Sequence, residues 1–335
     1  MRTGTVIGVI AAIVGLILVL GWGDVGGPNG SIVIGLFQGA AYGLLAVGLV
    51  LVYKGTRVFN FAAGEFGTLA AFIAFLFIHQ WNIVPYGLGV LFALVAITLL
   101  GLFMERVIVR PLMNAPRVTL LVATIAFGLL LVGVELFAFR PEPKDLHPLI
   151  QAIDPASGEP VGPELAGYYV SPQQMIIVGV VLLLAVALGW FFSKTDRGLA
   201  ILATSQDAFA TRVVGIGVAR TSQLIWGMAA FLGALAGILY VPAGGALAPG
   251  VITTQTLIPA FTAAVIGGMT SLPGAFVGGI VVGLLQQLAL WASGHYYLGD
   301  QPWQQFIPGS ADVAVFAALL IVLLARPQGL LGTEA

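Results

Sequence analysis

Three charged residues lie close together in a chain that is otherwise poor in charge. In "YKGTRVFNFAAGEFG", residues 53–67, Lys54, Arg57 and Glu65 lie between two apolar runs, although only 8% of the 335 residues are charged. A charged side chain beside or within a membrane-length apolar run is costly and usually faces a partner or a water-filled path. This segment is therefore the first candidate for chemistry.

Other kinds of reactive site are not indicated. The sequence has no cysteine, so it can form neither a disulfide nor a thiolate site. Its three histidines, His79, His147 and His295, stand far apart, and we expect ordinary interfacial or loop roles for them rather than a metal site. No Ser/His, Asp/Asp or His-x-x-Glu-His arrangement falls within an apolar run, which disfavours an intramembrane enzyme.

The sequence also contains no nucleotide-binding P-loop. That loop needs Gly-Lys followed by Ser or Thr, but none of the three lysines, Lys54, Lys144 and Lys194, follows a glycine. We expect no cofactor on this chain, and if ATP drives it, another chain must hold the nucleotide. The net charge of -1 gives no basic face for nucleic acid.

Apolar runs long enough to cross a membrane recur along the chain. Hydrophobic residues make up 59% of it and the mean hydropathy is +1.05, well outside the range of soluble domains. A helix needs about 18 or more apolar residues to cross the hydrocarbon core. The sequence predicts one all-α transmembrane domain, residues 1–335, a polytopic bundle of about eight to ten membrane helices. The runs are 5–22, 31–53, 61–79, 86–104, 118–138, 174–192, 221–242, 255–268, 274–293 and 310–325.

Three of these runs leave alternatives open. Residues 61–79 open with polar Glu65 and Thr68, and 255–268 is short, so either could be tilted, broken or re-entrant. Residues 5–22 could be a cleaved signal peptide. A first span is favoured, because the run is long for a signal core and no small-x-small site with alanines follows it.

The basic residues indicate the orientation. Short cytoplasmic loops carry an excess of Lys and Arg. With ten crossings and both termini cytoplasmic, eleven of the 13 basic residues lie on the inner side. Only Arg140 and Lys144 lie outside, in the acidic extracytoplasmic loop 139–173, which is too short for a core of its own.

Small residues predict close helix packing. Gly35, Gly39 and Gly43 fall at a spacing of four and line one face of the second run. In lipid, such glycines let helix backbones approach closely. We expect this face to pack against another helix in a tight bundle.

Residues 193–220 form the longest predicted cytoplasmic loop. An N-cap signal at Thr195 or Asp196 and good helix formers over 199–210 predict a short helix, ended by Gly215. Such a helix could occupy a groove on a soluble partner. It could equally lie on the inner membrane surface with its basic residues facing lipid phosphate.

Four stretches, in this order, resemble one family of membrane proteins. They are "NFAAGEFG" (60–67), "ERVIVRPL" (105–112), the 193–220 segment, and "GGMTSLPGAFVGG" (267–279), with "RPQGLLG" following from residue 326. The pattern is similar to the H-type permeases of branched-chain amino acid ATP-binding-cassette importers, a family that includes urea and short-amide permeases. The resemblance covers residues 31–332. The sequence departs from it at Ala63, where histidine is usual, and at Thr270, where glycine is common.

The resemblance implies a transport subunit with partners and no enzymatic activity of its own. It would lie in the lipid of a bacterial or archaeal plasma membrane. It would pair with an M-type permease or a second copy of itself. Two cytoplasmic ATPases, which would hold ATP and Mg²⁺, and an extracytoplasmic substrate-binding protein would complete the complex. The ATPases would meet a coupling segment that includes Asp207, Ala210, Arg212, Gly215 and Ile216.

The signature stretch is expected to act as a gate or hinge near the cytoplasmic side, through Asn60, Phe61, Gly64 and Glu65. Three roles are open for Glu65. Its carboxylate could pair with Arg57 or another inner basic residue, favour the positive N-terminus of the third helix, or line the substrate path. Pairing or capping is favoured over substrate contact.

Interrupted helices indicate where a substrate could bind. Transporters often bind substrate at the ends of broken helices near the midplane, and this chain is interrupted around 242–249 and 267–274. The amide side chains there could equally join helices by hydrogen bonds. The candidate path residues are Gln38, Thr254, Gln255, Gly267 and Gly268.

Three hypotheses for the function are compared. The leading hypothesis is the permease subunit of an ATP-driven importer that moves branched-chain or related amino acids inward by alternating access. A urea or short-amide permease of the same family is the alternative, since nothing in the sequence measures the size of a substrate pocket. An ion-coupled secondary transporter is less favoured, because Glu65, Glu135 and Asp312 lie near predicted span ends rather than in mid-span.

Overall fold

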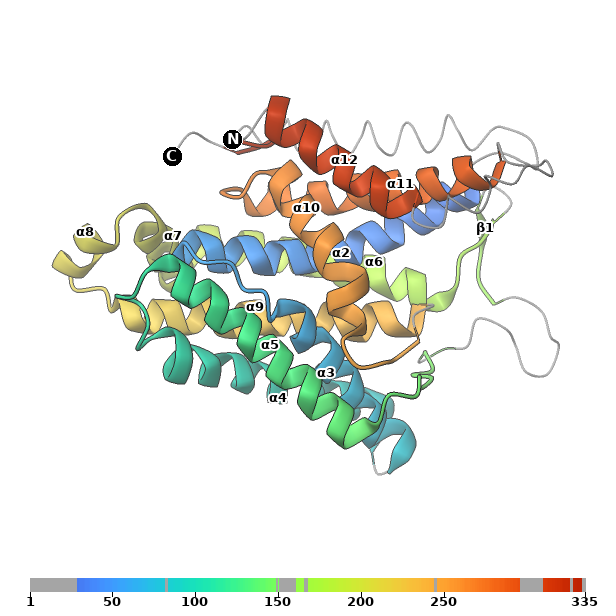
Figure 1. The fold of residues 1–335 in the computed structure, drawn as a ribbon, viewed down its shortest axis with the longest axis horizontal. Helices are drawn as coiled ribbons and strands as arrows, with labels where there is room; N and C mark the ends of the chain where they lie inside the picture. The colour runs from blue at the N-terminus through green and yellow to red at the C-terminus, as the bar shows by residue number, and fades with distance from the viewer. Residues whose placement is uncertain are drawn as a thin grey trace.

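The chain forms a bundle of long helices with a small hairpin at one end (Figure 1). The computed structural model describes residues 29–81, 84–148, 150, 161–165, 168–243, 246–295, 310–325 and 328–332. The predicted span 5–22 lies outside these residues. The predicted polytopic all-α fold is confirmed, since almost all regular structure in the described part is helical.

The helices follow the apolar runs of the sequence. Seven helices among the described residues are long and apolar enough to cross a membrane. They are α2 (Asn29–Thr56), α3 (Ala63–Phe75) with the π-helical turn η1 (Leu76–Gln80), α4 (Tyr86–Met104) with the π-helical turn η2 (Glu105–Val109), α5 (Arg117–Phe139), α6 (Pro172–Lys194), α9 (Val218–Tyr240) with the 3-10 turn η3 (Val241–Ala243), and α11 (Leu272–His295). Two are shorter: α10 (Ile258–Gly267), which continues the π-helical turn η4 (Thr253–Leu257), and α12 (Ser310–Ala325).

Helices α2 and α9 lie at the centre of the bundle. In each, 78% of the most apolar stretch is buried inside the protein, against 17% in α6 and 28% in α4. The outer helices instead expose large apolar side chains such as Leu99 and Val186. Because lipid tails are as apolar as these side chains, such surfaces are stable only within a bilayer.

The helix of the third run begins inside the bundle, after a non-helical segment. After α2 the chain turns at Arg57, which has a positive φ of 57°, and residues 57–62 run back into the bundle before α3 begins (Figure 1). Asn60 and Ala62 in this non-helical segment are buried. The break therefore lies before the predicted run 61–79, and the run itself forms an unbroken helix of membrane-spanning length over Ala63–Gln80.

The two ends of the bundle differ. Strands β1 (Glu164–Leu165) and β2 (Tyr168–Tyr169) form an antiparallel hairpin at one end. The short helices α7 (Asp196–Gln206) and α8 (Ala208–Val213) lie at the opposite end (Figure 1). The single helix predicted over 199–210 is thus two helices, because Asp207 is extended and its Oδ1 accepts hydrogen bonds from the backbone of Phe209 (2.8 Å) and Ala210 (3.0 Å).

Candidate functional site

The non-helical segment before α3 is held by side chains that take the place of helical hydrogen bonds. Asn60 Oδ1 accepts a hydrogen bond from the Ala62 backbone at 3.1 Å. On α5, Thr124 Oγ1 accepts one from the Phe61 backbone at 3.4 Å and lies 3.2 Å from the Phe59 carbonyl oxygen. Non-helical backbone is tolerated at membrane depth only where such partners are found. The signature segment is therefore tied to α5.

Glycine brings the start of α3 against two other elements. A Cβ at Gly64 would collide with the side chain and backbone of Thr253 in η4, and one at Gly67 would lie 2.9 Å from the Gly233 carbonyl oxygen on α9. No other residue fits these positions without moving the neighbouring backbone. The signature glycines thus place Glu65 beside η4.

Glu65 faces a second carboxylate rather than a basic residue. It lies in the first turn of α3, where the helix dipole favours a carboxylate. Its side chain interacts with Thr68, Thr253 and Glu135, and among the described residues it forms no ion pair with Arg57 or any other cation. Glu65 is 2% and Glu135 0% exposed. No pattern in the sequence relates these two carboxylates, because each lies near the end of a different apolar run.

Gln38 lies in a polar seam between α2 and α11. Its Oε1 accepts a hydrogen bond from Gln287 Nε2 at 2.7 Å, and one turn further Tyr42 donates to Gln286 Oε1 at 2.6 Å. Gln38 also lines a small pocket of about 70 Å³ between α2, α6 and α9, together with Phe37 and Tyr240. The amide therefore joins two helices and also faces a cavity.

The predicted path residues fall in three separate places, of which Gln38 on α2 is one. Gly267 and Gly268 end α10, where the C-terminal segment packs on them: Leu330 donates its backbone N–H to the Ile266 carbonyl at 2.7 Å, and a Cβ at Gly268 would lie 2.5 Å from the Gly332 nitrogen. Thr254 and Gln255 are exposed and lie in η4, which precedes α10 and is therefore at the other end of the same continuous helical segment. The structure does not bring these two pairs together or place them beside Gln38.

The exposed side of η4 and α10 continues into an aromatic cluster. Ile258, 44% exposed, follows Gln255 by one turn, and Phe261 follows it in turn. The ring of Phe261 lies 5.4 Å from that of Phe59 and 6.3 Å from that of Phe61. We call Phe59, Phe61, Thr254, Gln255, Ile258 and Phe261 the α10 face.

The glycine face of α2 lies directly on α11. A Cβ at Gly35 would lie 2.9 Å from the Gly283 carbonyl oxygen, and one at Gly39 would lie 2.7 Å from that of Gly279. At Gly43 it would lie 3.0 Å from the ring of Phe276. Glycines on both helices therefore set the backbone-to-backbone distance at the centre of the bundle.

The α7–α8 end presents apolar side chains to solvent. Phe209, Val213 and Val214 are 76%, 72% and 73% exposed, and Ala210 and Arg212 are exposed between them. Gly215 has a positive φ of 85° with open space around it, and the Ile216 backbone donates to Thr211 at 3.1 Å. An exposed apolar patch with polar residues beside it is typical of an interaction site.

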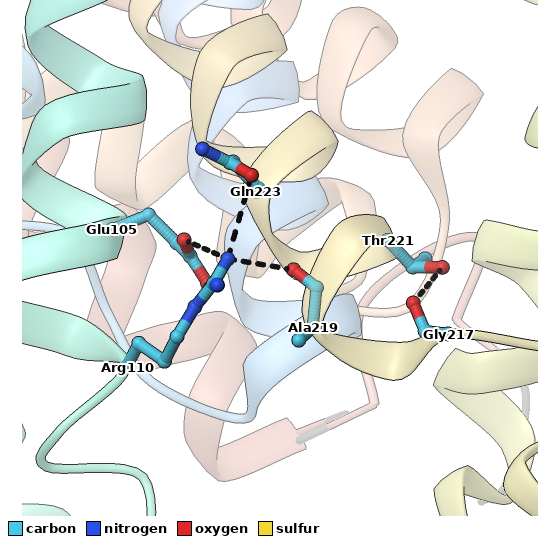
Figure 2. A network of polar contacts seen from close by, with 6 residues as sticks. All are labelled: Glu105, Arg110, Gly217, Ala219, Thr221 and Gln223. Atoms are coloured by element: carbon cyan, nitrogen blue, oxygen red, sulfur yellow. Dashed lines mark hydrogen bonds and ion pairs between the residues drawn. The ribbon is translucent and has the colours of Figure 1, made fainter.

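An ion pair that the sequence reasoning did not single out ties this end to α4. Arg110 donates through Nη2 to Glu105 Oε2 at 2.8 Å and through Nε to Oε1 at 3.3 Å. The same Nη2 reaches the Ala219 carbonyl at 3.1 Å and Gln223 Oε1 at 3.4 Å on the first turns of α9 (Figure 2). In the π-helical turn η2, residues five apart lie one above the other, so the side chains of Glu105 and Arg110 meet. Arg110 thus clamps α9, just after α8, to the end of α4.

The family described as "Branched-chain amino acid transport system / permease component" matches residues 31–324 of this chain. The permease protein BraD of Pseudomonas aeruginosa is 32% identical over 309 residues, which cover 90% of this chain and 95% of BraD. LivH of Escherichia coli is 29% identical, with 89% and 93% covered. A probable LivH of Methanocaldococcus jannaschii is 28% identical, with 87% and 88% covered. A chain of PsaBC from Streptococcus pneumoniae, solved with a Fab, aligns at a TM-score of 0.46 and 15% identity over 89% of this chain and 91% of its own.

Proposed function

The chain belongs to the family of permease components of branched-chain amino acid transport systems, and on this premise we propose how it works as the permease subunit of an ATP-driven importer of these amino acids. The family match over residues 31–324, on a bundle with seven membrane-length helices, is the observation that carries this function. The relatives are named as high-affinity branched-chain amino acid permeases. The protein is a multi-pass protein of the plasma membrane.

We propose that the other parts of the importer are separate chains: a second permease, M-type or identical, two ATPases and an extracytoplasmic binding protein. The absence of a Gly-Lys-Ser/Thr loop from the sequence supports a separate ATPase. The exposed apolar patch of Phe209, Val213 and Val214 supports its docking on α8. The two coupling residues would then act in different ways. Asp207 would cap the N-terminus of α8, and the exposed Arg212 would contact the ATPase.

The orientation follows from charge. Both termini and the α7–α8 end face the cytoplasm in this proposal, because eleven of the 13 basic residues then lie inside. The β1–β2 hairpin, at the opposite end of the bundle, faces the side from which a binding protein delivers substrate (Figure 1).

The substrate path runs along the α10 face in this proposal. This face combines an amide and a hydroxyl with apolar rings, the chemistry that a branched aliphatic amino acid needs. Its Thr254, Gln255 and Ile258 are exposed and its three rings half-buried in the single chain, so a second permease would close it into a path. The signature segment forms one wall through Phe59 and Phe61, and its non-helical backbone can change conformation during alternating access.

Copurification and ATP hydrolysis test this function. The tagged chain is expressed with the permease and ATPase genes encoded beside it, and the complex is placed in lipid nanodiscs with the binding protein. We expect ATP hydrolysis to rise when the binding protein is loaded with leucine, and not when it is offered urea or acetamide. Stimulation by the amides but not by leucine would refute the amino acid assignment.

A further inference from the structure

We infer that Glu65 and Glu135 together form a proton-binding site inside the bundle, in which one proton is held between the two carboxyl groups. The inference does not depend on the proposed function, since it rests on the carboxylates and their surroundings alone.

The two carboxyl groups come from different helices and meet in the interior. Glu65 lies in the first turn of α3 and Glu135 in the last turns of α5, and both carboxyl groups reach Gly250. Glu135 Oε2 accepts its backbone N–H at 3.0 Å, and Glu65 Oε1 lies 3.8 Å from the position of a Cβ on Gly250. Both residues are more than nine-tenths buried. Water therefore cannot screen the repulsion that two negative charges would feel there.

The hydrogen-bond donors around the pair do not satisfy it. Glu135 Oε2 accepts the backbone N–H of Gly250 at 3.0 Å, and the hydroxyls of Thr68 and Thr253 lie beside Glu65. Glu65 Oε2 and Glu135 Oε1 are buried without a hydrogen-bond partner. Two buried acceptor atoms without a donor are costly, and a proton on either carboxyl supplies a donor.

No cation is placed to neutralise the pair within the described part of the chain. Helix α3 carries no titratable residue besides Glu65, and η4 and α10 carry none. The only other charged residue of α5, Arg117, lies at its far end, about 27 Å along the axis. Arg140 and Lys144 follow α5 but form no ion pair with either carboxylate, and Lys144 Nζ lies over the Phe75 ring at 6.0 Å. His79 in η1 faces His147, and Tyr240 on α9 faces Tyr42.

Holding one proton resolves this arrangement. Two adjacent carboxylates in an apolar interior cannot both be ionised, and such pairs share a proton and titrate as a unit. The shared proton would link α3, α5 and the turn at Gly250, which has a positive φ of 72° and precedes η4. Loss of the proton would push α3 and α5 apart next to the α10 face.

Infrared spectroscopy of the full-length chain in lipid nanodiscs tests for the proton directly. At neutral pH in deuterated buffer, the wild type is expected to show a protonated-carboxyl C=O stretch that is absent from the Glu65→Gln plus Glu135→Gln double variant. Glu142→Gln, an exposed outer position, should leave the band unchanged. If the double variant and the wild type give the same spectrum in this region, no carboxyl of the pair is protonated and the inference is wrong.

Thermal stability against pH gives an independent test in the same preparations. The folded state holds a proton that the unfolded chain releases above about pH 4, so from there the folded-to-unfolded ratio of the wild type should fall by up to about tenfold per pH unit. The fall should end at the pH where the folded pair also loses its proton. Glu65→Gln and Glu135→Gln each replace one carboxyl group by a neutral amide, so the remaining carboxylate has no like charge beside it. The stability of these variants should therefore change less with pH, while that of Glu142→Gln should follow the wild type. A wild-type profile as flat as those of the Gln variants would overturn the inference. Recovery of the wild type's thermal stability at high pH on addition of Na⁺ or K⁺ would also overturn it, because it would identify a metal-ion site instead.

Discussion

Glycines fix the distance between helices α2 and α11. The glycine face of α2 and the glycines of α11 approach so closely that a Cβ on either side meets backbone rather than a movable side chain. In a bilayer, burial of apolar surface gives no driving force for this contact, so the contact depends on close van der Waals packing of the two helices. A larger residue there cannot be accommodated by a rotamer change.

Substitution of Gly39 tests this packing. Gly39→Leu should destabilise the bundle by about 1–3 kcal/mol or more, because the new side chain has no space beside the Gly279 carbonyl. The measurement is the thermal transition of the purified protein in detergent. Gly179→Leu, on the outer helix α6 with open space around it, is the matched control and should change the transition little. Equal effects of the two substitutions would argue against a glycine-dependent contact.

The clamp between α4 and α9 depends on a single guanidinium. Arg110→Gln leaves the buried Glu105 carboxylate without its cation, which typically costs about 3–5 kcal/mol. The thermal transition should fall, and the double variant Glu105→Gln plus Arg110→Gln should recover part of the loss because no charge is then buried alone. Arg106→Gln, an exposed position on the same turn, is the control. If the double variant is no better than the single one, the ion pair is not the cause.

At the scale of elements, α8 is the proposed docking site for the ATPase. Phe209→Asp plus Val213→Asp places two charges on the apolar patch and should abolish copurification of the ATPases while leaving the thermal transition unchanged, since neither side chain is buried. Leu165→Asp is the control, at an exposed apolar position of the hairpin end that an ATPase could not reach in the proposed orientation. Retention of the ATPases by the α8 variant would place their contact elsewhere.

The apolar runs predicted most elements well, because a membrane helix must satisfy its own backbone and therefore extends over the whole run. The predicted run 310–325 and α12 coincide, and 118–138 differs from α5 by one residue at each end. The break at Asp207 was missed, although an aspartate is a common N-cap and could have indicated a second helix start.

The candidate site was less predictable than the elements. Gln38 was named from its residue type, but its partner Gln287 lies on a helix far away in sequence, and no local pattern relates the two. The same holds for Glu65 and Glu135, which look like span-end charges until α3 is seen to begin inside the bundle. Contacts set by tertiary packing leave no periodic signal in a single sequence.

At the scale of the whole molecule, the account requires that transport depend on other chains. The α10 face is open in the single chain, and the sequence has no P-loop. This chain alone should therefore neither hydrolyse ATP nor accumulate substrate, even with an ion gradient across the membrane.

The most direct test is uptake of radiolabelled leucine into proteoliposomes that contain this chain with its partner permease, ATPases and binding protein. We expect leucine to accumulate only with ATP and every chain present. Excess isoleucine or valine should suppress this uptake, and urea should not. Leucine uptake by this chain alone, driven by an ion gradient without ATP, would contradict it.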